Sequence, residues 1–225
     1  MSDEEEANGV DDVEEIDEVD EAAPPTETPT TIVIATHNAH KVEEIARSLV
    51  PLIGFALDLQ PVTGKPPKED GSTFAENALI KARAAFARTG LPSLADDSGV
   101  CVDALDGAPG INSARYTAAG TDEANRKALL DAMKGHKNRN AKFVCAVAFV
   151  TAESERVEIG EWTGKLRMTE KGDNGFGYDP IFAPDHVTVT AAELSPNVKA
   201  ALSHRARALG QIAPAINRYI AEKLA

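Results

Sequence analysis

Two adjacent carboxylates inside an apolar run are the feature that most constrains this chain. Asp96 and Asp97 follow Leu94 and Ala95, and apolar residues resume at Val100. This pattern predicts a buried strand that ends in a polar loop or a sharp bend at the two acids. Neighbouring carboxylates repel each other unless a cation or a proton lies between them. The stretch therefore indicates either a site for a hard divalent cation, Mg²⁺ first of all, or an Asp-rich turn without a metal.

Acidic residues are distributed unevenly along the 225-residue chain. Residues 1–30 hold 13 of the 36 Asp and Glu residues and no Lys or Arg, so the other 23 acids balance the 23 bases. We predict a disordered acidic tail over residues 1–30 and one folded domain over residues 31–225. Because the domain is neutral, it lacks the general basic surface of a nucleic-acid-binding protein, yet it can hold a local cationic cluster for a small anion.

Compartment and membrane contact can also be judged from the sequence. No run of 18 apolar residues occurs, and the acidic N-terminus lacks the apolar segment of a secretion signal. Cys101 and Cys145 lie far apart in apolar, strand-like runs, which favours two buried reduced thiols over a disulfide or a metal site. We expect a cytoplasmic protein that does not span a membrane.

A strand-to-helix turn opens the predicted domain. Residues 31–35 are continuously apolar, as in a buried strand, and residues 42–49 place apolar side chains at helical spacing. The turn between them, from Thr36 to Lys41, offers free backbone N–H groups and the positive end of the helix dipole. A Lys at a helix N-terminus is unfavourable unless an anion binds beside it. The turn therefore indicates a phosphate site, or else an Asn38 N-cap with an exposed Lys41.

A second helix is predicted over residues 73–89, before Gly90. Thr73 and Glu76 match a capping box, so we assign Glu76 a structural role. Glu69 and Asp70, in the preceding Gly- and Pro-rich loop, have no such role and are free to reach a metal. Lys81 is surrounded on the helix by small residues that allow it to approach a neighbouring element, although it can equally be a solvated position.

The remaining elements follow from shorter patterns. Residues 55–60 are typical of an edge strand, and residues 141–151 and 156–166 of a hairpin. Helices are predicted over residues 121–134, after Ser195, and after Ser203, with Pro214 expected to kink or split the last one.

Two further segments contain candidate ligand-binding residues. The glycine-rich loop at residues 172–180 carries Phe176 and Tyr178, which can stack on a nucleotide base or turn into the core. His204 and Arg205 begin the last helix, where they can donate to a carbonyl or a phosphate or form a surface pair.

Taken together, these motifs resemble the Ham1-like inosine triphosphate pyrophosphatases over residues 31–225. Single motifs are weak, but several occur in the family's order with suitable spacing. They lie at residues 36–41, 73–82, 95–99, 107–116, 175–180, 191–194 and 199–205.

The resemblance implies an elongated α/β fold with a mixed, twisted central sheet, flanking helices and two lobes around an active-site cleft. It implies a homodimer that uses Mg²⁺ to hydrolyse ITP, dITP and XTP to the monophosphate and diphosphate, which cleanses the nucleotide pool. Two features depart from the pattern. His37 stands where the family usually has Gly, and a side chain makes a positive φ costly there. The acidic tail has no counterpart in the family pattern.

The resemblance also implies roles for single residues. Asp97 is expected to be the general base and, with Glu69, a ligand of Mg²⁺, with Asp96 as support. An ordinary Asp is a weak base at neutral pH, so metal help for the attacking water is also expected. The expected substrate-binding residues are Thr36, His37, Asn38, Ala39, His40, Lys41, Lys81, Ser98, Phe176, Gly177, Tyr178, Asp179, Lys199, His204 and Arg205.

Within that set, the residues divide by the part of the nucleotide they would meet. Cationic side chains from Lys41, Lys81 and Lys199 would clamp the polyphosphate. His204 and Arg205 would donate to the 6-oxo group of hypoxanthine or xanthine, and adenine would leave these donors unpaired.

Three alternatives stay open at this point. The first is a Maf-type nucleotide pyrophosphatase acting on other bases, which base preference would distinguish. The second is a non-catalytic nucleotide-binding protein that holds ITP without hydrolysing it. The third is an interaction protein that works through residues 1–30, which deletion of that segment would test.

Overall fold

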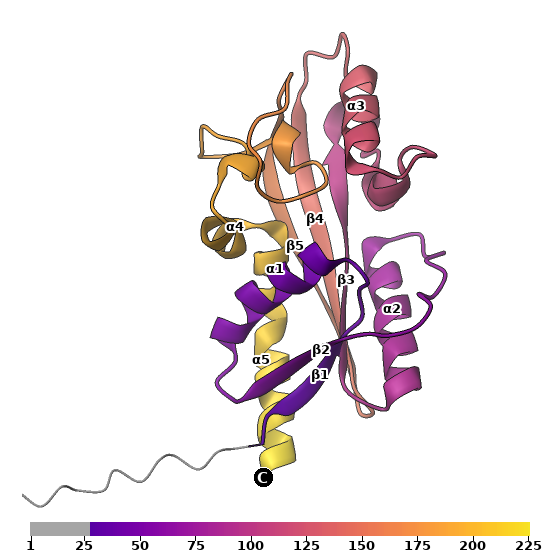
Figure 1. Cartoon of the computed structure of the whole chain (residues 1–225), viewed down its shortest axis with the longest axis vertical. Coiled ribbons are helices and arrows are strands. Elements are labelled where there is room, and N and C mark those ends of the chain that lie inside the picture. The colour runs from indigo at the N-terminus through magenta and orange to yellow at the C-terminus, as the bar shows by residue number, and fades with distance from the viewer. Residues whose placement is uncertain (1–27) are drawn as a thin grey trace, which may run out of the picture.

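One mixed six-stranded sheet runs through the computed structural model, which describes residues 28–225 (Figure 1). Its strand order is β2-β1-β3-β4-β5-β6, with β1 parallel to both β2 and β3 and the other pairs antiparallel. The strands are β1 (Thr30–Ile34), β2 (Leu57–Pro61), β3 (Ser93–Val102), β4 (Asn140–Val150), β5 (Glu155–Leu166) and β6 (Phe182–Pro184). The predicted edge strand and hairpin are confirmed. The acidic tail falls almost wholly outside the described residues and stays a prediction.

Five α-helices cover this sheet. They are α1 (Ala39–Leu49), α2 (Phe74–Thr89), α3 (Asp122–Ala132), α4 (Pro196–Leu202) and α5 (His204–Leu224). Side chains alternate along β3 and β4, so Leu94 and Cys145 pack towards α1 and α5, while Ala95 and Ala146 pack towards α2. None of the described helices combines the length and apolar composition needed to span a bilayer.

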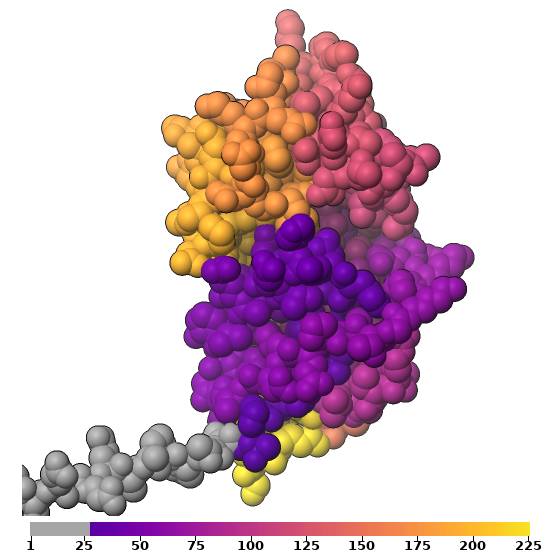
Figure 2. All heavy atoms as spheres, viewed as in Figure 1, coloured from indigo at the N-terminus to yellow at the C-terminus, as the bar shows by residue number. Residues whose placement is uncertain are grey.

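The molecule has a lower and an upper lobe that share the long strands β3, β4 and β5 (Figure 1). The lower lobe contains β1, β2, α1, α2 and α5. The upper lobe contains α3 and the loops around residues 103–121 and 167–194, and it has its own apolar core with Val102, Phe143 and Trp162. A recess separates the two lobes in the space-filling view (Figure 2). The expected α/β fold with two lobes is confirmed.

Three expectations need correction. Strand β3 does not end at Asp96 and Asp97 but continues through them, because both residues keep their ladder partners on β4. Helix α5 continues through Pro214 without a break. Proline has no N–H, so the carbonyl of Gly210 has no helical hydrogen bond, but both residues are exposed and solvent can reach that carbonyl. Cys101 is only half-buried, although Cys145 is buried as expected and both thiols are free.

Candidate active site

A cleft of about 380 Å³ lies between the two lobes. It is walled by the turn before α1, the loop before α2, the exposed edge of α2, the centre of β3, the glycine-rich loop and the start of α5. The predicted residues that line it are Thr36, His37, Asn38, Lys41, Glu69, Lys81, Asp97, Ser98, Phe176, Gly177, Tyr178, Lys199, His204 and Arg205. Three other predicted residues, Ala39, His40 and Asp179, are not part of this lining.

The two adjacent carboxylates point to opposite faces of β3, because neighbouring side chains of a strand alternate. Asp97 faces α2, where its Oδ1 lies 2.9 Å from Lys81 Nζ. Asp96 faces α1 and α5, where its Oδ2 lies 2.8 Å from Arg205 Nη2 and 3.1 Å from Lys41 Nζ. Each acid thus has cations of its own, which relieves the repulsion. The expectation that Asp96 supports the metal stays a prediction, and its own ion pairs lie on the face opposite Asp97.

On the α2 face, Lys81 bridges two carboxylates. Its Nζ lies 3.2 Å from Glu69 Oε2 as well as 2.9 Å from Asp97 Oδ1. Burial lowers the pKa of Lys81, but the charges of Asp97, Asp96 and Glu69 outweigh burial and hold the pKa above its usual value. Asn77 Nδ2 donates a long bond of 3.4 Å to Asp97 Oδ2. The expectation that Lys81 approaches a neighbouring element is confirmed.

Asp97 itself is set up as a stronger base than an ordinary Asp. Burial raises its pKa, and Lys81 and Lys41 only partly offset this effect, so the pKa lies above the usual value. A carboxylate with a raised pKa takes a proton from water more readily near neutral pH.

The Glu69–Asp97 pair also fits a divalent cation. Both carboxylates already hold the same positive atom, Lys81 Nζ, and carboxylate oxygens are the ligands that Mg²⁺ prefers. Among residues 28–225, no group of three or more His, Cys, Asp or Glu side chains gathers to hold a metal. Mg²⁺ usually keeps several waters and binds through one or two carboxylates plus substrate phosphates, so a pair is sufficient.

On the opposite face of β3, six charged side chains form a continuous series of ion pairs, which we call the Asp96 network. The series runs through Lys41, Asp96, Arg205, Glu44, Lys199 and Asp179. Lys41 and Arg205 hold the pKa of Asp96 far below its usual range, although burial opposes them. Three cations meet three carboxylates, so the network is neutral as a whole.

Arg205 and His204 are buried, so the surface-pair interpretation is wrong. The Arg205 guanidinium donates twice to Asp96 and also bonds Glu44 and Ser98. Four of its five N–H groups are therefore used, and one is left for a ligand.

The His204 ring stacks on Phe143, with 4.8 Å between the ring centroids. Its Nδ1 is buried without a hydrogen-bond partner. Burial, together with the charges of Arg205 and Lys199, holds the pKa of His204 well below its usual value. The imidazole is therefore neutral near pH 7 and offers one donor and one acceptor.

Both aromatic residues of the glycine-rich loop border the cleft, but their rings have different surroundings. The Phe176 ring has Lys199 Nζ 4.9 Å from its centroid and the exposed His40 ring stacked at 5.4 Å. Tyr178 instead belongs to the core of the upper lobe, and its hydroxyl donates to Ser113 O at 2.8 Å. Tyr178 therefore packs into the core, as one interpretation predicted, and stacking of Phe176 on a base stays a prediction.

Helix α3 and Asp179 hold this loop in place. Asp179 Oδ2 accepts from Phe176 N at 2.8 Å, and Gly177 N donates to Asp122 Oδ2 at 2.7 Å. Arg126 donates to Gly177 O at 2.9 Å. A Cβ at Gly175, where φ is +75°, would overlap Asp179 Oδ2, so this position requires glycine.

At the turn before α1 the predicted N-cap is confirmed, the predicted exposure of Lys41 is wrong, and the phosphate site stays a prediction. Asn38 is the N-cap, with its Oδ1 accepting from Lys41 N at 3.2 Å, yet the Lys41 side chain is only 16% exposed because it reaches Asp96. His37 is not among the residues with positive φ, so the departure from glycine costs no backbone strain. Its Nε2 lies 2.7 Å from Gly64 O.

Sequence reasoning missed several residues of the site. Glu44 joins Lys199 and Arg205, and only its position one turn after Lys41 could have indicated that it faces the same way. Asn77 lies one turn before Lys81 on α2, so its side chain points to the same side of the helix, towards Asp97. For Asp122 and Arg126 no local signal exists, since their partners lie more than 40 residues further along the chain.

The Ham1 family model matches residues 32–215. A dITP/XTP pyrophosphatase of Leifsonia xyli subsp. xyli is 48% identical over 189 residues, which is 82% of this chain and 94% of the relative. A dITP/XTP pyrophosphatase of Streptomyces avermitilis is 44% identical over 199 residues, 85% of this chain and 99% of the relative. Among solved structures, a HAM1 protein from Coxiella burnetii superposes with a TM-score of 0.76 at 39% identity, covering 84% of this chain and 99% of that one.

Proposed function

The chain belongs to the Ham1 family, and on that premise we propose that it hydrolyses the purine nucleoside triphosphates ITP, dITP and XTP to monophosphate and diphosphate. The observation that carries the proposal is that an aromatic ring, a buried His and a carboxylate pair bridged by Lys81 all line one cleft. Phe176 and His204 would bind the base, and Glu69, Lys81 and Asp97 would serve hydrolysis.

Asp97 is the general base in this proposal. Its Oδ1 is engaged by Lys81, whereas its Oδ2 has only the 3.4 Å contact with Asn77, so Oδ2 is the oxygen that accepts the proton from the attacking water. The raised pKa of Asp97 suits this role. Hydrolysis between the α- and β-phosphates then releases diphosphate as the leaving group.

Glu69 and Asp97 would hold Mg²⁺, which stays a proposal. When bound, Mg²⁺ supplies neutralisation of phosphate charge and a lower pKa for the water it carries. Lys81 keeps the two carboxylates together, because its ammonium contacts both of them.

The polyphosphate is clamped by groups from both lobes. The turn from Thr36 to Lys41 supplies backbone N–H groups at the start of α1. Lys41 and Lys199 line the same cleft and are each paired with carboxylates of the Asp96 network. A triphosphate competes with these carboxylates for the two ammonium groups.

Base selection rests on donors that an adenine cannot satisfy. The remaining N–H of Arg205 and the donor nitrogen of neutral His204 can bond a 6-oxo group, which hypoxanthine and xanthine carry. Adenine presents an amino donor instead, and each buried donor left unpaired costs about 1–3 kcal/mol. Phe176 supplies the ring on which the base stacks.

We also propose a homodimer in the cytoplasm that binds no nucleic acid. The free thiols of Cys101 and Cys145 support a reducing compartment, and the balanced charge of residues 31–225 argues against a nucleic-acid partner. Sedimentation velocity tests the dimer, because a single species at the monomer mass would overturn it.

Diphosphate release from ITP, XTP, GTP and ATP, measured in parallel with Mg²⁺ and with a chelator, tests the proposal. Rapid, metal-dependent release from ITP and XTP, with little from ATP or GTP, is the expected result. Release from none of the four would overturn the proposed activity, and tight binding of ITP in that case would identify a non-catalytic nucleotide-binding protein. Activity only on other bases would identify the Maf-type alternative.

A further inference from the structure

The loop between β2 and α2 forms one wall of the cleft, and we call residues 62–72 the Glu69 loop. Three successive carbonyls near its start are gripped by side chains from two other elements. Arg88, in the last turn of α2, donates to Thr63 O and, at 2.9 Å, to Lys65 O. Between them, His37 Nε2 lies 2.7 Å from Gly64 O. Because a carbonyl oxygen only accepts, Nε2 carries the hydrogen of this bond.

The far end of the loop is fixed by α2. Gly71 N donates to Asn77 Oδ1 at 2.9 Å, and the Nδ2 of the same Asn77 reaches Asp97. Between these two ends, Glu69 is tied to the body of the protein through Lys81. The position of the Glu69 carboxylate therefore depends on how firmly both ends of the loop are held.

We propose that His37 is a positioning residue that ties the phosphate-binding turn to the Glu69 loop and so sets where Glu69 stands relative to Asp97. The inference rests on the proposed function, in which Glu69 is a Mg²⁺ ligand and the turn binds phosphate. A glycine at position 37 has no side-chain donor, so this chain gains a link between the two segments that the expected family residue lacks. Triphosphate bound at the turn and metal bound at Glu69 thus share one mechanical connection.

Three variants at position 37 separate the contribution of the hydrogen-bond donor from that of the ring. His37→Gly removes the whole side chain, His37→Phe keeps a ring but removes the donor, and His37→Gln keeps an N–H donor. Arg88→Ala removes the other two hydrogen bonds to the loop, those to Thr63 O and Lys65 O, and should loosen the Glu69 loop as His37→Phe does. Arg83→Ala is the matched control, since Arg83 also lies on α2 but pairs with the distant Glu155 on the surface.

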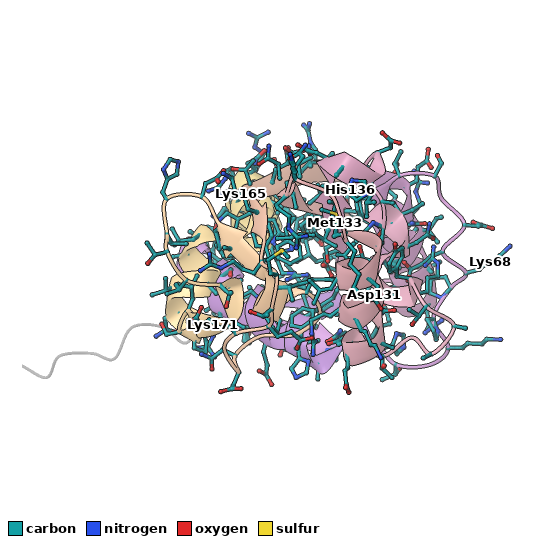
Figure 3. The ribbon with its side chains drawn as sticks, turned by 90° about the horizontal axis from the view of Figure 1, so that it is seen from above. Lys68, Asp131, Met133, His136, Lys165 and Lys171 are labelled. Carbon is teal, nitrogen blue, oxygen red and sulfur yellow. The ribbon has the colours of Figure 1, made fainter. Side chains whose placement is uncertain are left out.

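Tryptic cleavage reports the anchoring directly and without turnover. Lys65 precedes Pro66, which blocks trypsin, so the Lys68–Glu69 bond is the cleavable site in the loop. The Lys68 side chain is 86% exposed and extends away from the body of the protein (Figure 3). Losing one net hydrogen bond should raise the cleavage rate roughly fivefold in His37→Phe and His37→Gly. His37→Gln and Arg83→Ala should remain near the parent rate. Equal rates in all variants would overturn the proposal.

The Mg²⁺ dependence of ITP hydrolysis tests the consequence for Glu69. The Mg²⁺ concentration for half-maximal activity should rise roughly fivefold in His37→Phe, and His37→Gln should restore the parent value. A rise in KM for ITP with unaltered Mg²⁺ dependence would overturn the proposal, because His37 would then contact the phosphates itself. If the parent protein releases no diphosphate at all, the proposed function fails, and the cleavage rates still decide whether His37 anchors the loop.

Discussion

The two faces of strand β3 neutralise their carboxylates to different degrees. On the α2 face, Glu69 and Asp97 share the single cation Lys81, which leaves one negative charge in excess. On the opposite face, the Asp96 network matches three carboxylates with three cations. Burial raises the pKa of Asp97 and Lys81 and Lys41 offset it only in part, whereas Lys41 and Arg205 outweigh burial at Asp96 and hold its pKa far below the usual range. The face that is short of positive charge can accept a metal and a proton, and the neutral network holds Lys41, Lys199 and Arg205 at the cleft.

The largest expected effect is the loss of turnover when the acid on the α2 face, Asp97, is replaced. Asp97→Asn removes the general base and should lower kcat for ITP by a factor on the order of 10²–10⁴. Because burial disfavours the charged form of Asp97, the neutral amide should leave the melting temperature within a few degrees of the parent. Steady-state kinetics and calorimetry check both parts. Substantial turnover by a folded Asp97→Asn protein would remove Asp97 from its role.

The same substitution at the neighbouring residue should act on stability. Asp96→Asn leaves the buried Arg205 with one carboxylate fewer, and breaking a buried ion pair costs about 3–5 kcal/mol. For a domain of this size the melting temperature should fall on the order of 10 °C. Calorimetry of Asp96→Asn and Asp97→Asn under the same conditions compares their melting temperatures. If the melting temperature of Asp96→Asn fell no further than that of Asp97→Asn, the distinction between the two faces would be contradicted.

The pH dependence of stability should have opposite signs for the two acids. The folded-state pKa of Asp96 is below its unfolded value, so Asp96 stabilises the protein above about pH 4 and loses a few kcal/mol of that contribution as the pH falls further. The pKa of Asp97 is raised, so its contribution is present at low pH and is lost as the pH rises through that pKa. The free energy of unfolding, measured by urea titration from pH 3 to pH 7, should fall less towards low pH in Asp96→Asn than in the parent. If the free energies of both proteins changed with pH in parallel, Asp96 would not be the stabilising acid.

The comparison extends to the two aromatic residues of the glycine-rich loop. Phe176→Ala removes the ring that faces the cleft, and loss of base stacking costs about 1–3 kcal/mol, so KM for ITP should rise roughly tenfold. The effect should be similar for XTP, since stacking tolerates either base. Initial-rate measurements with both substrates check this, and an unchanged KM would show that the base lies elsewhere.

The smallest effect is expected at Tyr178. Tyr178→Phe deletes the hydroxyl that donates to Ser113 O and should cost about 1 kcal/mol, or about 2–4 °C in melting temperature. Turnover should stay within twofold of the parent, because the ring remains packed in the upper core. A KM change as large as that of Phe176→Ala would mean that both rings contact the base.

Local patterns predicted the elements and their ends well. Thr73, Thr121 and Ser203 each cap the helix assigned to them, and the hairpin pairs as expected. Glu76 is a partial exception. Its amide bonds Thr73 as in a capping box, but its carboxylate accepts from Ser72 one residue earlier. Such details depend on the few residues around each helix start, which a sequence displays directly.

Contacts across the chain could not be predicted in the same way. Asp96 and Asp97 were assigned to one site because a loop places no constraint on direction, whereas a strand sends them to opposite faces. The pairing of Glu44 with Lys199 joins residues 155 positions apart. Only the order of strands in the sheet brings α1 and α4 together, and no local pattern encodes that order.

The long strands β3, β4 and β5 pass without a break from the lower lobe into the upper one. Because these strands are hydrogen-bonded to one another along their length, they join the two lobes more firmly than single connecting loops would. The walls of the cleft that lie outside this frame are the Glu69 loop and the glycine-rich loop. Substitutions in those two loops can therefore alter the entrance to the cleft without disturbing the strand that carries Asp97.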